Sequence, residues 1–290
     1  KKDQAVHALT NVDLTLYRGE TLALVGESGC GKSTLGRTLI RMLPATRGSV
    51  TFEGQNITAM KDKEFAPLRR RMQMVFQDPY ASLDPRMKVR DIIAEPLETY
   101  HVCKTKAETT HRVLELMQAV GVPAEFLNRY PHQFSGGQRQ RIGIARALIV
   151  EPEFIIADEP ISALDMSIRA QVLNLLRHLQ KERGITYLFI AHDLSVMRYI
   201  SDRIAVIHKG NIVELADAEE LVTHAIHPYT RSLLSAIPMP NPRLERKKKL
   251  LVYDPAMHDY TQEAPQWREL RPSHWVLCSE QEAKDWLAEM

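Results

Sequence analysis

The stretch from Gly26 to Thr34 limits what this chain can fold into more than any other part of it. Its residues Gly26, Glu27, Ser28, Gly29, Cys30, Gly31, Lys32, Ser33 and Thr34 match the phosphate-binding loop pattern G-x-x-x-x-G-K-[ST] at each fixed position. The apolar run Thr21–Val25 before it predicts a buried strand. Lys32–Leu43 after it has apolar residues at helical spacing and stops at Pro44. This order of strand, loop and helix is the context that the pattern requires.

The pattern predicts an anion site. Gly26, Gly29 and Gly31 allow backbone conformations that other residues avoid, and they leave room beside a phosphate. The N–H groups at the start of the following helix favour a negative charge. Lys32 is expected to reach the β- and γ-phosphates of a nucleotide, and Ser33 to offer its hydroxyl to Mg²⁺. The alternative is a chance glycine turn before a helix, and the flanking strand and helix argue against it.

Composition excludes several classes of protein. The chain has 290 residues with 38 Lys and Arg against 36 Asp and Glu, so a formal charge of +2 gives no reason to expect a nucleic-acid partner. Its three cysteines are far apart and odd in number, which favours a reducing compartment over a disulfide framework. No apolar run reaches the ~18 residues that span a bilayer, and we expect neither a membrane span nor a signal peptide. Because the sequence opens at Lys1 without Met, we expect it to begin inside its domain.

Alternation of strands and helices predicts an α/β core with an inserted helical subdomain at about residues 86–150. The expected strands are Val12–Leu16, Thr21–Val25, Gly48–Phe52, Arg71–Phe76, Phe154–Ala157, Thr186–Ala191 and a hairpin at Ile204–Leu215. The expected helices are Lys32–Leu43, Lys106–Val120, Gln138–Ile149, Ser167–Arg183 and Leu194–Ile200. After Ala216 the pattern weakens.

Two acids follow a hydrophobic strand at Phe154–Glu159, and this segment resembles a Walker B motif. Asp158, at the carboxyl end of the strand, is placed to hold magnesium through water. Glu159 projects differently and can accept a proton from an attacking water molecule. Taken alone, the two residues are better explained as surface acids at a strand end; the upstream phosphate loop favours the catalytic interpretation.

A second candidate anion site lies at Ser135, Gly136, Gly137 and Gln138. Ser135 stands at a helix N-cap position, Gln138 completes an S-x-x-Q capping box, and the glycines bare their N–H groups. In isolation these residues are as well explained by helix capping. The stretch from Phe134 nevertheless resembles the signature [LF]-S-G-G-Q of the ATP-binding cassette (ABC) family.

Three further family elements occur in the family's order. They are Gln77 at the Q-loop position, Asp165 at the end of the D-loop Ser162-Ala163-Leu164-Asp165, and His192 at the switch-histidine position. The resemblance covers residues 11–216 and implies a P-loop NTPase with a RecA-like core, an antiparallel β subdomain and the helical insertion. It implies ATP and Mg²⁺ as cofactors. The implied catalytic residues are Glu159, His192 and Gln77, and the implied metal ligands are Ser33, Gln77 and Asp158. The implied nucleotide contacts are residues 26–34, residues 135–138 and Asp165.

The same resemblance implies a site shared between two chains. Two cassettes of this family pair head to tail, so that the phosphate loop of one and the Ser135 segment of the other close on one ATP. The family also stacks adenine on an aromatic residue in its first strand. No aromatic residue precedes Tyr17, so we expect the adenine-stacking residue to lie upstream of Lys1. Ile161 stands where many members carry Thr, and little effect is expected.

Finer features resemble the ATPases of peptide and nickel importers. They are Phe76–Arg86, His227–Pro238, and the tail with Tyr253-Asp254-Pro255 and His258-Asp259-Tyr260, which is most similar to an ATPase subunit of oligopeptide permeases. Residues 1–225 are expected to form the nucleotide-binding domain, and residues 226–290 a family-specific extension. Many relatives bind an iron–sulfur cluster through a cysteine-rich tail; only Cys278 lies beyond Cys103, so no cluster is expected.

The implied partners are a paralogous ATPase, two transmembrane permease subunits and an extracytoplasmic peptide-binding protein, with this chain at the cytoplasmic face of the membrane. The permease helices are expected to dock near Gln77–Arg86. The basic run Arg243–Lys249 reads as a solvated linker, or as a contact for anionic lipid headgroups. The alternatives are a dipeptide or nickel importer subunit, a non-membrane ABC ATPase and a catalytically silent regulatory binder; intact Lys32, Asp158, Glu159 and His192 argue against the last.

Overall fold

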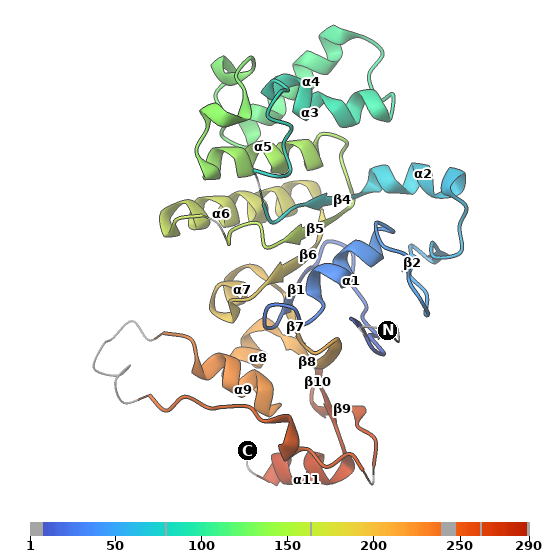
Figure 1. Cartoon of the computed structure of the whole chain (residues 1–290), viewed down its shortest axis with the longest axis vertical. Coiled ribbons are helices and arrows are strands. Elements are labelled where there is room, and N and C mark those ends of the chain that lie inside the picture. Colours follow the sequence, from blue (N-terminus) through green and yellow to red (C-terminus); the bar gives the residue numbers. More distant parts are fainter. Residues whose placement is uncertain (1–7, 79, 163, 239–247, 262, 289–290) are drawn as a thin grey trace, which may run out of the picture. The chain divides into compact units, whose positions relative to one another are not determined.

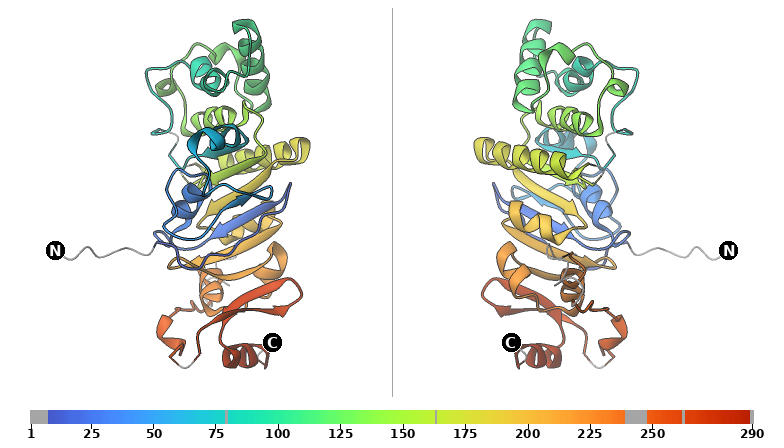
Figure 2. Two further views of the ribbon diagram at one scale, coloured as in Figure 1. Left: turned by 90° about the vertical axis from the view of Figure 1, so that its right-hand side faces the viewer. Right: turned by 90° about the vertical axis from the view of Figure 1, so that its left-hand side faces the viewer.

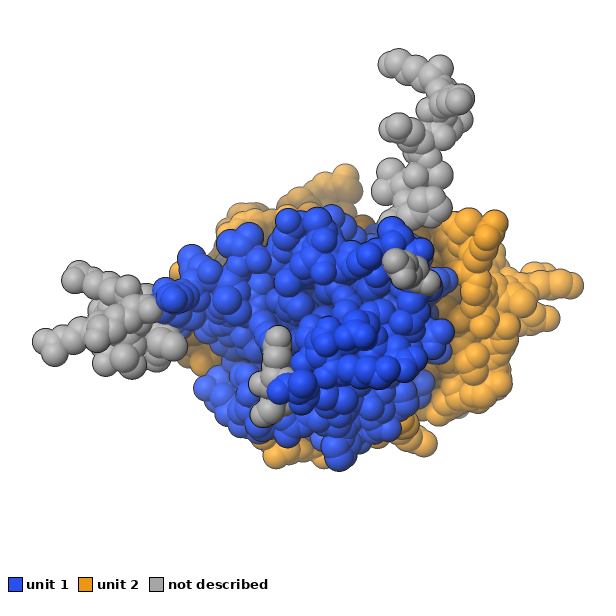
Figure 3. Space-filling view, turned by 90° about the horizontal axis from the view of Figure 1, so that it is seen from below, with its two compact units in different colours: residues 1–16, 21–35, 190–290 blue, residues 17–20, 36–189 orange. Residues whose placement is uncertain are grey.

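The structure is a computed structural model that describes residues 8–78, 80–162, 164–238, 248–261 and 263–288. The chain divides into two compact units, coloured separately in Figure 3. Unit 1 comprises residues 1–16, 21–35 and 190–290, and unit 2 comprises residues 17–20 and 36–189. The predicted basic run Arg243–Lys249 lies outside the described residues except for Lys248 and Lys249.

The strands of unit 1 form a mixed parallel and antiparallel arrangement. Their order is β1 (Thr21–Val25), β7 (Arg203–His208), β8 (Asn211–Asp217), β10 (His274–Cys278) and β9 (Gln266–Arg271). β1 runs parallel to β7 with Leu22 opposite Arg203, and each later pair is antiparallel. All five residues of β1 are buried, as expected for an apolar, β-prone run covered on both faces. This strand leads directly into the phosphate loop.

Short helices accompany these strands in unit 1 (Figure 1). They are α7 (Leu194–Ile200), α8 (Ala218–Thr223), α9 (Pro228–Ser235) and α11 (Glu280–Ala288), with a 3₁₀ turn η3 at Pro255–Met257. In the C-terminal part, Val276, Cys278, Ala283 and Trp286 form a small core with Ile226. Two elements cross the unit boundary along the chain: α1 (Lys32–Leu39) begins in unit 1, and β6 (Thr186–Ala191) ends in it.

Unit 2 contains the strands that carry the acidic residues. β4 (Met72–Val75) and β5 (Phe154–Asp158) are parallel, with Met72 opposite Phe154. A separate antiparallel hairpin joins β2 (Thr51–Phe52) to β3 (Gln55–Asn56) through Glu53 and Gly54, which have φ of 47° and 77°. These left-handed values suit a two-residue hairpin turn.

The helices of unit 2 include the block predicted at residues 86–150. They are α2 (Asp62–Arg71), α3 (Val89–Thr99), α4 (Lys106–Ala119), α5 (Gly136–Leu148) and α6 (Met166–Arg183), with 3₁₀ turns η1 (Ala124–Phe126) and η2 (Pro131–Gln133). Figures 1 and 2 show α3, α4 and α5 in one group, and α5 also packs against α6 and β4.

Three sequence predictions are wrong in detail. The strand predicted at Gly48–Phe52 comprises only Thr51 and Phe52, and Gly48 takes a φ of 86°. Residues 12–16 do not form a strand, although their exposure alternates as predicted. The Thr15 carbonyl accepts from the Arg203 side chain instead of joining a strand ladder. The helix predicted at Lys32–Leu43 ends at Leu39, because Arg41 takes a φ of 58° and the N–H groups of Met42 and Leu43 both turn back to the Arg37 carbonyl.

The predicted strands in β1, β4, β5 and β6 and the predicted β7–β8 hairpin are confirmed within a residue or two. The three cysteines are free thiols, in agreement with the sequence. None of the helices in the described part of the chain combines the length and the apolar character needed to cross a bilayer.

Candidate functional site

The phosphate loop, residues 26–34, lies in unit 1 between β1 and α1 and is held through its main chain. The Gly210 N–H donates to the Cys30 carbonyl at 2.9 Å, and the Leu35 N–H donates to the Gly31 carbonyl at 2.9 Å. The Glu27 N–H donates to the hydroxyl of Tyr229 at 3.1 Å. These bonds tie the loop to the β7–β8 turn, to its own helix and to α9.

Lys32 lies under this loop with only 4% of its surface exposed. Its ammonium donates to the carbonyls of Gly26 and Glu27, at 2.7 Å each, and lies 3.8 Å from the Cys30 sulfur. Burial raises the pKa of the Cys30 thiol, so this sulfur is neutral at physiological pH. A buried cation beside the N–H groups at the start of a helix makes the loop a suitable site for phosphate.

Gly31 is the position where the loop admits no side chain. Its φ is 109°, and a Cβ added there would lie 2.4 Å from the Ala8 carbonyl oxygen and 3.1 Å from Leu9. Both the conformation and the close approach of another backbone therefore require glycine. The clash that any side chain would make here explains why the sequence pattern has its second fixed glycine at this position.

The acidic loop, residues 158–165, follows β5 in unit 2. Asp158 is the last residue of the strand and is 1% exposed. Glu159 has a φ of 45°, a left-handed conformation that costs a non-glycine residue free energy and is concentrated at functional sites. The Gln77 amide donates from Nε2 to Glu159 Oε2 at 2.9 Å. The structure therefore brings together two predicted site residues that are far apart in sequence.

The rest of the acidic loop is fastened by side chains. The Ser162 hydroxyl donates to the Glu159 carbonyl at 3.0 Å. Arg169, one turn into α6, donates from Nε to the Leu164 carbonyl at 2.7 Å and from Nη2 to the Ser162 carbonyl at 3.3 Å. Asp165 occupies the N-cap position of α6, and no hydrogen bond from its side chain caps that helix. Arg169 was not identified from the sequence, since a lone arginine on a predicted helix carries no signal.

The Ser135 segment forms the predicted capping box at the start of α5. The Gln138 N–H donates to Ser135 Oγ at 3.3 Å, and the Ser135 N–H donates to Gln138 Oε1 at 3.0 Å. A Cβ on Gly137 would lie 2.4 Å from Cγ2 of Ile168, so this glycine allows α5 to approach α6. Gly136 lies against Leu164 of the acidic loop. Helix capping is thus confirmed for these residues, and their glycines also contact the neighbouring loop and helix.

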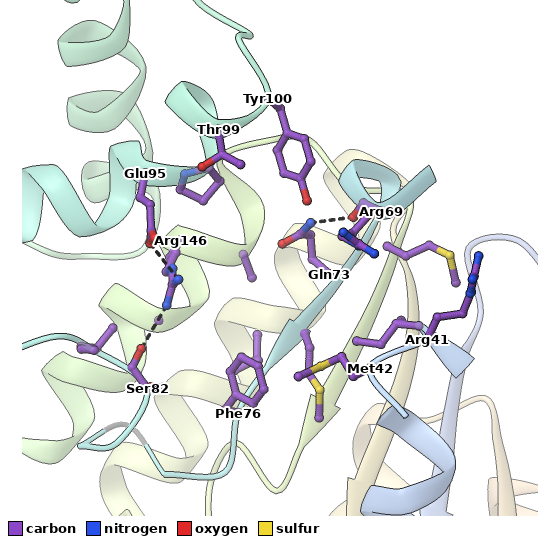
Figure 4. Close-up of a pocket in the computed structure, with 18 of the residues that line it drawn as sticks. Arg41, Met42, Arg69, Gln73, Phe76, Ser82, Glu95, Thr99, Tyr100 and Arg146 are labelled. Atoms are coloured by element: carbon purple, nitrogen blue, oxygen red, sulfur yellow. Dashed lines mark hydrogen bonds and ion pairs between the residues drawn. The ribbon is translucent and has the colours of Figure 1, made fainter. Parts of the chain in front are cut away.

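A pocket of about 440 Å³ opens beside the Q-loop stretch in unit 2 (Figure 4). Arg146 of α5 donates to the Ser82 carbonyl at 3.0 Å and pairs with Glu95 of α3 at 2.7 Å. The rest of the lining includes the apolar and basic side chains of Ile40, Arg41, Met42, Arg69, Met72, Met74, Phe76 and Leu83, together with the polar side chains of Gln73, Thr99, Tyr100 and Gln140. Arg139 of α5 also lies over the Tyr80 ring at 3.9 Å, so the stretch after Gln77 is bound to the helical block.

His192 lies in unit 1, directly after β6, with an exposed side chain. The next residue, Asp193, caps α7 by accepting from the Ser195 N–H at 2.9 Å. The start of this helix therefore fixes the backbone on the carboxyl side of His192.

The donors predicted for magnesium suit this ion chemically. Ser33 offers a hydroxyl, Gln77 an amide oxygen and Asp158 a carboxylate, and Mg²⁺ prefers oxygen ligands with few carboxylates. Asp158 at 1% exposure is a buried acid at a strand end, and a buried carboxylate needs a cation or hydrogen-bond donors nearby. The donor set therefore fits magnesium.

Comparison with known proteins gives one consistent result. The model of the ABC transporter family matches residues 9–162, and the model of the oligopeptide/dipeptide transporter C-terminal region matches residues 213–262. The oligopeptide transport ATP-binding protein OppF of Bacillus subtilis is 59% identical over 281 residues, which is 96% of this chain and 92% of that protein. The oligopeptide transport ATP-binding protein AmiF of Streptococcus pneumoniae is 56% identical over 95% of this chain and 90% of that protein.

Solved structures agree. The dimeric ATP-binding cassette MJ0796, in a post-hydrolysis state bound to ADP and Pi, has a TM-score of 0.69 and 31% identity, covering 75% of this chain and 94% of that chain. CbiO1 from Clostridium perfringens, part of the ABC transporter complex cbiONQ, has a TM-score of 0.69 at 27% identity, covering 83% of this chain and 91% of that chain. The P-loop NTPase fold predicted from the sequence is thereby confirmed.

Proposed function

This chain belongs to the ABC transporter family, and we propose that it is the ATP-hydrolysing subunit of a bacterial importer for oligopeptides. The observation that carries the proposal is its 59% identity, over 96% of its length, to an oligopeptide transport ATP-binding protein. The order of the phosphate loop, Ser135 segment, acidic loop and His192 supports ATP hydrolysis as the reaction. The pocket beside the Q-loop stretch supports coupling to a partner.

The phosphate loop supplies nucleotide binding. Its N–H groups and the Lys32 ammonium hold the β- and γ-phosphates, and the glycines leave room for them. Ser33, Gln77 and Asp158 would hold magnesium, and a magnesium ion so bound would supply positive charge that neutralises the phosphate oxygens.

The acidic loop supplies hydrolysis. Glu159 accepts the proton of the attacking water, and the hydrogen bond from Gln77 holds its carboxylate in one orientation. His192 contacts the γ-phosphate. Removing a positioned general base costs roughly 10²–10⁴ in rate, so Glu159 carries a large part of the catalysis.

The Ser135 segment serves a second cassette. Ser135, Gly136, Gly137 and Gln138, with Asp165, act on the ATP bound by a paralogous ATPase in a head-to-tail heterodimer, and that subunit's signature acts on the ATP bound here. A dimeric arrangement in the solved cassette MJ0796 supports this pairing. The isolated chain is therefore expected to hydrolyse ATP slowly.

The remaining partners are two transmembrane permease subunits and an extracytoplasmic peptide-binding protein. A cytoplasmic helix of a permease subunit docks in the pocket lined by Phe76, Ser82, Glu95, Tyr100 and Arg146 (Figure 4). The chain then sits at the cytoplasmic face of the membrane. We assign residues 1–225 to the nucleotide-binding domain, with its helical subdomain at about 86–150, and residues 226–290 to the extension.

The direct test is transport in a reconstituted system. Vesicles containing the permease subunits, both ATPases and the peptide-binding protein should accumulate a labelled oligopeptide only when MgATP is present on the ATPase side. A complex built with Glu159→Gln should bind MgATP and accumulate peptide far more slowly. ATP-driven uptake of dipeptides or nickel without uptake of oligopeptides would contradict the assignment, and failure of the chain to associate with any permease subunit would favour a non-membrane ATPase.

A further inference from the structure

The segment His227-Pro228-Tyr229, which resembles peptide importers in sequence, contacts the phosphate loop. The Tyr229 hydroxyl accepts from the Glu27 N–H at 3.1 Å, and both residues belong to unit 1. They are 202 positions apart in the chain. The bond therefore links the segment matched by the oligopeptide/dipeptide C-terminal model to the nucleotide site.

The start of α9 fixes the Tyr229 backbone. His227 is the N-cap residue, and its Nδ1 accepts from the Tyr229 N–H at 3.1 Å. Burial lowers the pKa of the His227 imidazole to about 3, so the ring stays neutral and its Nδ1 can accept this bond at physiological pH. Pro228 at the first helical position suits the helix start, because its missing N–H would have no partner there.

Aromatic packing fixes the Tyr229 side chain. The residue is 1% exposed, and its ring lies 4.2 Å from the ring of His208 and 5.3 Å from the ring of Tyr253, centroid to centroid. Burial also raises the pKa of the phenol, so the hydroxyl stays protonated and neutral. A neutral hydroxyl held in this position is a stable acceptor for the Glu27 N–H.

A buried carboxylate connects α9 to the C-terminal strands. Glu214 of β8 is fully buried and accepts from the N–H groups of Ile226, at 2.7 Å, and His227, at 3.3 Å. The same carboxylate lies 2.7 Å from Nε2 of His274 in β10, which is also fully buried. The position of Tyr229 is therefore set by both β8 and β10.

The phosphate loop has two supports from later parts of the chain. The first is Gly210 in the β7–β8 turn, whose N–H donates to the Cys30 carbonyl. The second is Tyr229 in the C-terminal segment, whose hydroxyl accepts from the Glu27 N–H. We propose that Tyr229 is a positioning residue: it holds the first turn of the phosphate loop in the shape that accepts the phosphates, and so makes nucleotide affinity depend on the C-terminal segment. The inference rests on the proposed role of this loop in binding MgATP.

A single hydroxyl tests this role. Tyr229→Phe keeps the ring and removes the acceptor, and Tyr253→Phe is the matched control, because it removes a hydroxyl from the same aromatic cluster without contacting the loop. Binding of a non-hydrolysable MgATP analogue to the full chain should weaken about three- to tenfold in Tyr229→Phe, the effect of losing one ordinary hydrogen bond. The control should bind as the wild type does.

Hydrogen exchange gives a second readout that does not depend on the nucleotide. In the nucleotide-free wild type the Glu27 amide should exchange slowly, and Tyr229→Phe should make it exchange faster while the amides of β10 keep their wild-type rates. In the assembled transporter KM for ATP should rise, whereas kcat at saturating MgATP should stay within about twofold, since the bond acts on loop shape rather than on chemistry.

The outcomes separate the two proposals. Analogue binding by Tyr229→Phe at wild-type affinity would overturn the positioning role and leave the proposed function intact. A rapidly exchanging Glu27 amide in the wild type would overturn it as well, even where the variant fails to fold. A wild-type chain that binds no analogue, despite a protected Glu27 amide, would instead overturn the proposed function.

Discussion

The phosphate loop at residues 26–34 and the acidic loop at residues 158–165 are held by different kinds of contact. In the phosphate loop main-chain bonds do most of the holding: the Gly210 N–H donates to the Cys30 carbonyl, and the Leu35 N–H donates to the Gly31 carbonyl. One side chain of the loop itself, Lys32, also donates to the carbonyls of Gly26 and Glu27. In the acidic loop the side chains hold the structure: Gln77 binds the Glu159 carboxylate, and Arg169 binds two carbonyls.

This difference predicts which kind of substitution should impair each loop. A loop whose shape depends on its backbone conformation is distorted when a side chain is added. A loop held by side-chain hydrogen bonds loses its function when one of those side chains is removed. Additions to the phosphate loop should therefore weaken nucleotide binding, and deletions in the acidic loop should slow hydrolysis. Three of the four predictions that follow test this division, and the one at Gly137 tests the packing of α5 on α6.

The largest effect is expected at Glu159. Glu159→Gln keeps the size of the side chain and removes its basicity, so kcat of the assembled ATPase should fall roughly 10²–10⁴-fold, about 3–5 kcal/mol of barrier. MgATP affinity should stay within a few-fold of wild type, measured by equilibrium binding. An equal loss in binding and turnover would remove the distinction between the loops.

The next largest effect is expected at Gly31. Gly31→Ala combines a φ of 109° with an overlap at 2.4 Å on the Ala8 carbonyl, so MgATP affinity should fall by about 10–100-fold, from roughly 1–3 kcal/mol of backbone strain. Gly29→Ala is the matched control: it has a φ of 80° but no atom within 4 Å of the added Cβ, so its affinity loss should be smaller. Equal losses in the two variants would show that the close approach to Ala8 has no role.

A third prediction concerns the packing of α5 on α6. Gly137→Ala places a Cβ 2.4 Å from Cγ2 of Ile168 and should destabilise the chain by about 1–3 kcal/mol, measured by denaturant unfolding. Ile168→Ala in the same chain should recover part of the loss. Gly143→Ala, on the same helix with nothing within 4 Å, should not destabilise it, and a loss equal to that of Gly137→Ala would contradict the packing argument.

The smallest effect is expected at Arg169. Arg169→Met keeps most of the side-chain length but removes the bonds to the Leu164 and Ser162 carbonyls, so turnover should fall about three- to tenfold, the effect of one or two hydrogen bonds. Arg177→Met, at an exposed position of the same helix, is the control and should be neutral. Unchanged turnover in Arg169→Met would show that the acidic loop keeps its shape without these bonds.

Local patterns predicted the site better than they predicted its supports. The phosphate loop could be read from the sequence because Gly31 and Lys32 each have a local physical requirement. The strand at β5 could be read because its residues are apolar and end in acids. Tyr229 could not be assigned a role, since it binds Glu27, which only the fold brings near. Arg169 binds carbonyls that are close in sequence, but a lone arginine on a predicted helix carries no signal.

The C-terminal region shows the same limit. β9, with the sequence Gln-Trp-Arg-Glu-Leu-Arg, has no apolar run, and it is a strand because it pairs with β10. Residues 12–16 show the reverse case. Their hydrophobicity alternates as in a strand, but no strand in the described part of the chain pairs with them, so the strand predicted from this pattern does not form. Strand formation depends on pairing, and a single sequence does not show the pair.

The most direct test measures a single turnover of ATP that is already bound to the assembled complex. The Gly31→Ala complex is loaded at saturating MgATP, and the Glu159→Gln complex is compared with it at equal nucleotide occupancy. We expect that Gly31→Ala, once loaded, converts its ATP to ADP within about tenfold of the wild-type rate, while Glu159→Gln holds its ATP roughly 10²–10⁴ times longer. Rapid hydrolysis of bound ATP by Glu159→Gln, together with a stalled first turnover in Gly31→Ala, would contradict the assignment of hydrolysis to the acidic loop and of nucleotide binding to the phosphate loop.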